Sequence, residues 1–179
     1  MTLSRLVPNR HFPSYAYIPL RWPHPTRDSK GHSYGEGDEK VEPLDPKSWR
    51  QCQTYLYGID LFNYGYYWEA HDAWESVWLA CGRKGVTGDF LKGLIKLAAA
   101  GVKAREGRTQ RVQQQAKRAE ELFRQTAGSV GSQRSRYMGF SLAQLIGFAG
   151  RLRVRSVTAS NKGDNSVKIV FRFKLRPLL

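Results

Sequence analysis

The chain has 179 residues, of which 41% are hydrophobic and 12% aromatic, so it is long enough for one globular core and short for two. Its net charge is +14, and residues 101–155 hold 12 basic and only 3 acidic side chains, a balance that favours contact with nucleic acid or an acidic protein, although a solubilising basic face fits equally well. Two cysteines exclude a disulfide framework and a zinc finger, and no apolar run approaches the about 18 residues of a membrane span, so we expect a cytoplasmic protein without membrane contact.

Residues 1–44 form the first predicted unit, an extended arm. They contain six of the eight prolines, interleaved with aromatic residues, and repeated residue-proline steps exclude a helix. We expect this arm to lie across a helical body. Within it, His24, Asp28 and His32 either complete a site on that body or form a polar turn whose side chains bond the local backbone, and the polar turn is the favoured interpretation.

Residues 45–150 are predicted to form the helical domain. Asp45 is expected to cap a first helix with Pro46 at its first position, and Gly65 to end that helix. Further helices are predicted over 66–81, over 89–105 as a central helix, over 109–126 as an outer helix with one thin apolar stripe, and after a capping box of Ser141 and Gln144.

Residues 151–179 are predicted to form a strand pair or a tail. From Val167 to Leu175, apolar residues alternate with mostly basic ones, the pattern of a strand, and residues 153–158 are the expected partner. The predicted fold is therefore an all-α compact bundle of about five antiparallel helices with an extended Pro-rich arm and a small C-terminal β-hairpin.

The most distinctive stretch lies in the second predicted helix. At about 100° per residue, one face carries Tyr67 and Trp68 together with His71, Trp74, Glu75 and Trp78. The opposite face carries Glu69, Asp72 and Ser76. A face with three tryptophans is expected to turn inward, so the sequence predicts that His71 and Glu75 are buried with it.

His71 and Glu75 are the candidate site residues. Spaced i, i+4, they suit two ligands of one divalent metal ion or a carboxylate that orients an imidazole. Zinc normally takes three or four protein ligands, so further residues would have to join them. The alternative is a buried pair that satisfies itself within the core. Whether the protein is an enzyme stays open; if it is, metal-assisted or acid–base hydrolysis is the reaction class that these residues permit.

The residues from Phe62 to Trp78, followed by the block from Phe90 to Ala100, resemble the bacterial and archaeal family of unknown function numbered 309. The resemblance covers about residues 52–125 and implies a helical bundle with the signature H-x-x-x-E-x-x-W, here His71, Glu75 and Trp78. It implies suspected metal binding but no established activity. The chain departs from the family pattern at Asp72, where relatives tend to have glutamate, and at Lys96, where they tend to have glutamine.

Lys96 weakens the case for a metal, because a lysine facing Glu75 would compensate its charge directly. The pocket around the pair is predicted to include Asn63, Asp72, Trp74, Trp78 and Lys96. A different class of function is a tetratricopeptide-like, non-catalytic module that binds a protein or RNA through its basic outer face. The candidate nucleic-acid-binding residues on that face are Arg108, Arg111, Lys117 and Arg118.

Overall fold

The computed structural model describes residues 4–37, 40–131, 136–155, 157 and 166–179. Over these residues it contains five α-helices, and the predicted all-α bundle is confirmed. They are α1 (Gln53–Tyr64), α2 (Tyr67–Ala80), α3 (Gly85–Arg105), α4 (Thr109–Ser129) and α5 (Leu142–Val154). In the described ranges, no helix is long and apolar enough to cross a membrane.

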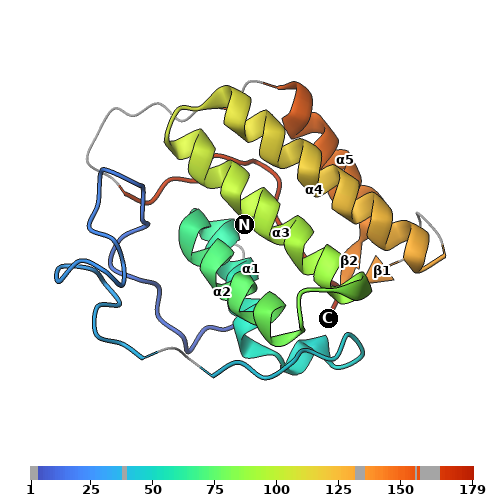
Figure 1. Ribbon diagram of the computed structural model, residues 1–179, viewed down its shortest axis with the longest axis horizontal. Helices are drawn as coiled ribbons and strands as arrows, with labels where there is room; N and C mark the ends of the chain where they lie inside the picture. The colour runs from blue at the N-terminus through green and yellow to red at the C-terminus, as the bar shows by residue number, and fades with distance from the viewer. Residues whose placement is uncertain (1–3, 38–39, 132–135, 156, 158–165) are drawn as a thin grey trace.

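The central helix is α3, as its composition predicts. It packs against α2 on one side and α4 on the other, and α5 packs against α4. Figure 1 shows α3 running between the α1–α2 pair and the α4–α5 pair. Its close approach to α2 depends on Gly101, where an added Cβ would lie 2.4 Å from the Tyr67 ring.

The first helix begins later than its cap signal predicts. Asp45 caps only a turn, in which its carboxylate accepts a hydrogen bond from the Lys47 amide at 2.9 Å. A 3-10 turn follows over Trp49–Gln51, and Cys52 is extended, with φ −78° and ψ 95°. The Trp49 ring is buried and meets Tyr55 edge to face, so tertiary packing outweighs the local helix signal here.

A small antiparallel hairpin is present, but it precedes α5 instead of following it. Its strands are β1 (Arg136–Tyr137) and β2 (Phe140–Ser141). The two turn residues, Met138 and Gly139, have φ of 44° and 86°, the left-handed pair that a tight hairpin turn requires. The prediction of a strand at 153–158 is wrong for its first two residues, because α5 extends to Val154. Residues 156 and 158 of the predicted strand lie outside the described part of the chain.

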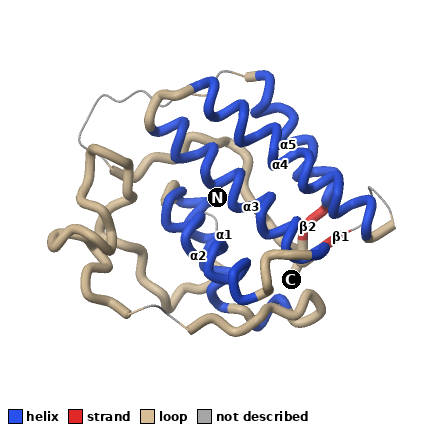
Figure 2. The backbone as a smooth tube through the Cα atoms, viewed as in Figure 1, coloured by secondary structure: helices blue, strands red, loops and turns tan. Residues whose placement is uncertain are grey.

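Two extended segments, residues 4–37 and 166–179, lie against the helices as loops (Figure 2). The second contains the predicted strand at 167–175, whose alternation is partly visible: Phe171 and Leu175 are buried and Arg172 is exposed. No strand partner pairs with it among the described residues. Its backbone bonds instead to side chains of the helices.

Asn63 and Tyr67 hold the C-terminal segment. The Asn63 amide nitrogen donates to the Leu175 carbonyl and its amide oxygen accepts from the Leu175 N–H, both at 2.8 Å. The Tyr67 hydroxyl accepts from the Val170 N–H at 2.9 Å, and burial raises the pKa of Tyr67 to about 12. Asn63, predicted as a pocket residue, therefore has an observed role in holding the backbone.

Asp60 holds the N-terminal segment in the same way. Its two carboxylate oxygens accept from the N–H groups of Leu6 and Val7, each at 2.9 Å. The Asp60 side chain is buried, with 1% exposure. A buried carboxylate with two backbone donors is a stable arrangement, because its charge is satisfied by hydrogen bonds.

We expect Asn63→Ala to lower the free energy of unfolding by about 2–4 kcal/mol, because the N–H and C=O groups of Leu175 lose their buried partners. Urea unfolding followed by circular dichroism measures this change. Gln125→Ala, on the exposed side of α4, is the control and should change stability by less than about 0.5 kcal/mol. Equal stability of the Asn63 variant and the wild type would contradict the proposed backbone role.

Candidate functional site

The inward face of α2 is centred on Ala70, Trp74 and Val77, each with 0% exposure. Trp74 donates its indole N–H to the Tyr55 carbonyl at 3.1 Å. The His71 and Glu75 side chains lie at the border of this face and are 30% and 38% exposed. The prediction that they are buried is therefore wrong: they are half-buried, at the edge where α2 meets α3.

Glu69, on the face that was predicted to point away from the core, is also buried, with 6% exposure. Its Oε1 accepts from the Tyr17 N–H at 2.7 Å and lies 3.2 Å from His32 Nε2. The prediction for Glu69 is wrong because the N-terminal arm covers this second face of α2. Both sides of the helix thus contact protein.

The arm histidines do not join the His71–Glu75 pair. His32 contacts Glu69, and the His24 ring meets Trp68 edge to face, with centroids 5.6 Å apart. Asp28 is exposed and accepts from the Lys30 N–H at 2.9 Å. The polar-turn interpretation is thus confirmed for Asp28.

The residues at the α2–α3 border form what we call the α2–α3 cluster: His71, Glu75, Trp78, Lys92 and Lys96. His71 Nδ1 lies 3.9 Å from one Glu75 oxygen, and Lys92 Nζ lies 4.0 Å from the other. The Lys92 ammonium also lies 3.8 Å from the centroid of the Trp78 ring, a cation–π contact. The cluster therefore joins an imidazole, a carboxylate and an ammonium group from two helices.

The Trp78 indole N–H is buried and has no hydrogen-bond partner among the described residues. Asp72 and Asn63, two other predicted pocket residues, lie elsewhere: Asp72 is exposed, and Asn63 binds Leu175. Trp74 packs in the core behind the cluster. Of the predicted pocket residues, Trp78 and Lys96 are the two that belong with His71 and Glu75.

The electrostatics of the cluster keep His71 neutral near pH 7. Burial lowers the pKa of His71, and the charges of Lys92 and Lys96 lower it further, while Glu75 raises it in opposition. The pKa of Lys96 is also lowered, first by burial and then by Lys92 and Arg118, and Glu75 again opposes the change. Lys96 thus interacts electrostatically with Glu75, as its position in the sequence suggested.

The cluster does not fit a divalent metal ion. His71 and Glu75 are two donors, and no group of three His, Cys, Asp or Glu side chains that could hold a metal occurs over the described ranges. Lys92 places a positive charge 4.0 Å from the Glu75 carboxylate, where it competes with a cation. Two donors beside an ammonium group are fewer than the three or four that structural and catalytic zinc sites use.

The predicted nucleic-acid residues lie on the outside of the molecule, and their charges are partly matched by carboxylates. Arg108 lies 3.0 Å from Glu106, and Arg118 lies 3.0 Å from Glu121. Arg111 and Lys117 are exposed. A nucleic-acid role for this face stays a prediction.

Comparison with known proteins bears on the segment that holds the cluster. Residues 55–114 match the family described as Domain of unknown function (DUF309), so this segment of the chain is similar to that family. The match spans nearly all of α1, all of α2 and α3, and the start of α4, so every member of the α2–α3 cluster lies inside it. A search of curated proteins finds no match.

Sequence reasoning missed two contacts, Lys92 with Glu75 and His32 with Glu69. Lys92 stands one helical turn before Lys96, so its presence on the same face could have been found from the i, i+4 spacing. The His32–Glu69 contact spans 37 residues, and no periodic pattern connects a loop residue with a helix residue so far away.

We expect Glu69→Gln to loosen the N-terminal arm and lower the free energy of unfolding by about 1–3 kcal/mol, because buried hydrogen bonds to a charged acceptor are replaced by weaker ones. Hydrogen exchange should show faster exchange at the Tyr17 amide, which donates to Glu69. Asp72→Asn, an exposed position on the same helix, is the matched control. Unchanged exchange at Tyr17 would show that Glu69 does not hold the arm.

Proposed function

We propose that the α2–α3 cluster is an acid–base site that hydrolyses a small substrate bearing an anionic group. The observation that carries this proposal is the convergence, within the family segment, of a partly exposed imidazole with a carboxylate and two lysines from a neighbouring helix. A metal-assisted reaction is less well supported, because the donor set does not fit a metal.

His71 is the proposed general base. Its lowered pKa leaves the imidazole neutral and able to accept a proton near pH 7. It would take a proton from water as the water oxygen adds to the substrate carbonyl, and then return that proton to the leaving group. Glu75, 3.9 Å from His71 Nδ1, would orient the ring and stabilise the imidazolium that forms in between.

Lys92 and Lys96 supply the proposed binding charge. Two ammonium groups next to one carboxylate leave a local positive charge, which suits an anionic group on the substrate. Trp78 fixes Lys92 through its ring face.

The pKa of His71, measured by NMR titration of its ring protons, should lie below the ordinary value of 6.5. Glu75→Gln should lower it further, because the carboxylate favours the protonated ring. Lys96→Gln should raise it, because a repelling charge is removed. Shifts in the opposite directions would contradict the arrangement of charges described above.

The lowered pKa of His71 also makes the free energy of unfolding depend on pH. The folded state disfavours protonation of His71, so the unfolded chain binds this proton more readily. The contribution of His71 to stability is therefore intact above pH 6.5 and is lost as the pH falls through its folded pKa. The difference in unfolding free energy between the wild type and His71→Gln should narrow as the pH falls below 6.5.

Hydrolysis of p-nitrophenyl hemisuccinate, a probe ester with a free carboxylate, should fall by about 100-fold or more in His71→Gln, the range expected for loss of a general base. The wild-type rate should rise with pH through a midpoint below 6.5. Lys92→Gln should raise KM for the hemisuccinate more than for neutral p-nitrophenyl acetate. Asp72→Asn is the control, and equal hydrolysis by wild type and His71→Gln would overturn the proposal.

A non-catalytic helical module that binds a protein or RNA through α4 is the second candidate. The exposure of Arg111, Lys117 and Arg118 supports it, whereas the carboxylates of Glu106 and Glu121 reduce the field of that face. We also propose a cytoplasmic location, which is supported by a chain of 179 residues that has only two cysteines and therefore no disulfide framework.

A further inference from the structure

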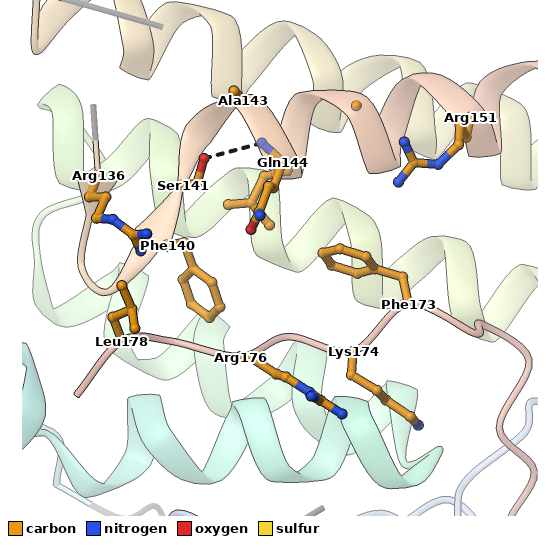
Figure 3. Close-up of a pocket in the computed structure, with 12 residues that line it drawn as sticks. Arg136, Phe140, Ser141, Ala143, Gln144, Arg151, Phe173, Lys174, Arg176 and Leu178 are labelled. Atoms are coloured by element: carbon orange, nitrogen blue, oxygen red, sulfur yellow. Dashed lines mark hydrogen bonds between the residues drawn. The ribbon is translucent and has the colours of Figure 1, made fainter. Parts of the chain in front are cut away.

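A second feature of the molecule lies outside the family segment. The hairpin, α5 and the last residues of the chain enclose an open cleft of about 760 Å³, a volume in the range of about 300–1,000 Å³ that is typical of ligand sites. We call it the C-terminal cleft. Its lining includes Arg136, Gln144, Arg151, Phe173, Lys174 and Arg176, drawn in Figure 3.

The C-terminal cleft is lined by four basic residues and no acidic one. The local sequence explains this balance. Residues 136–155 contain four arginines and residues 166–179 contain four basic residues, with no aspartate or glutamate in either range. The cleft thus faces solvent with a positive charge that its own walls do not neutralise.

Three of the four basic side chains in the cleft are accessible to a ligand. Arg136, Arg151 and Arg176 are exposed, and within the described part of the chain none of them forms a salt bridge. Lys174 is different, because its ammonium donates to the Asn63 carbonyl. Guanidinium groups bind phosphate through two parallel hydrogen bonds, so three exposed arginines favour a ligand with several phosphates.

An aromatic ring lies between these cations. Phe173 lines the cleft and is half-buried, and Phe148 stacks on it with centroids 4.3 Å apart and an interplanar angle of 18°. In Figure 3 the Phe173 ring projects between Arg151 and Arg136. A ring that is held from behind and bordered by arginines is the arrangement that stacks an unpaired base while the backbone is neutralised.

We propose that the C-terminal cleft binds single-stranded nucleic acid. The phosphates contact Arg136, Arg151 and Arg176, and a base stacks on Phe173. A duplex fits less well, because its bases are paired and not available to the ring. An acidic peptide of aspartate and glutamate offers carboxylates to the arginines. It has no planar ring that could stack on Phe173.

The test uses the full chain and a fluorescein-labelled 12-nucleotide oligouridine, with binding followed by fluorescence anisotropy at several salt concentrations. Arg151→Gln/Arg176→Gln should weaken binding about tenfold at low salt and reduce the salt slope by about 1.4, since each phosphate contact on a single strand contributes about 0.7. The matched control is Arg21→Gln/Arg27→Gln. It removes the same two charges from exposed positions of the N-terminal arm and should change binding less than twofold.

Phe173→Leu keeps an apolar side chain against Phe148 and removes the stacking surface. It should weaken oligouridine binding about fivefold, within the range for loss of one stacked base, while its melting temperature shows whether the fold is intact. If the melting temperature of Phe173→Leu is lower than that of the wild type, the comparison of the two double arginine variants tests the proposal instead. Equal losses from the two arginine pairs, equal affinity for a duplex of the same length, or equally strong competition by a 12-residue polyglutamate would each overturn the proposal.

Discussion

The structure depends on how two extended segments, one from each end of the chain, satisfy their backbone groups without a sheet. Buried N–H and C=O groups need partners, and side chains of α1 and α2 provide them. Asp60 accepts from Leu6 and Val7, and Asn63 pairs with both polar groups of Leu175. Side chains of the α1–α2 pair thus take the place of a neighbouring strand for both segments.

This constraint changes the meaning of the aromatic and polar stretch that begins at Phe62. Asn63 and Glu69 look like candidates for chemistry, but their observed contacts are with backbone groups and His32 of the extended segments. Gly65 shares this role, since an added Cβ there would lie 2.9 Å from the Lys168 carbonyl. Once these residues are assigned to packing, His71, Glu75 and Trp78 are what remains at an accessible edge.

The helices could be predicted because apolar residues recur at the helical period in each of them. Glycines mark their ends, and the single apolar stripe of α4 appears as buried Val112, Leu122 and Phe123. The alternation at 167–175 predicted a strand, but the structure, which describes all of these residues, has no strand there; Phe171 and Leu175 are buried, whereas Ile169, on the same predicted face, is exposed. The partner of this segment could not be predicted, because a strand pattern does not show that side chains of a helix will replace a second strand.

The site was predicted less completely, for a related reason. The i, i+4 spacing brings His71 and Glu75 together within one helix, and such a spacing is visible in a sequence. Their exposure depends on how α2 is rotated relative to α3 and on the N-terminal arm, which covers Glu69. Neither is encoded in the period of a single helix, so the face calculation misplaced the boundary between core and surface.

The fold also explains where the net charge of +14 acts. Several carboxylates of the helices already have partners. Asp60 and Glu69 accept hydrogen bonds from the extended N-terminal arm, and Glu120 forms salt bridges with Arg124 and Arg153. Glu75 is matched by Lys92 at the α2–α3 cluster. Since residues 136–155 and 166–179 contain no acidic side chain, the unmatched positive charge is concentrated where these two ranges meet. Folding thus converts a general excess of basic residues into a local field at the C-terminal cleft, some distance along the chain from the neutral imidazole of His71.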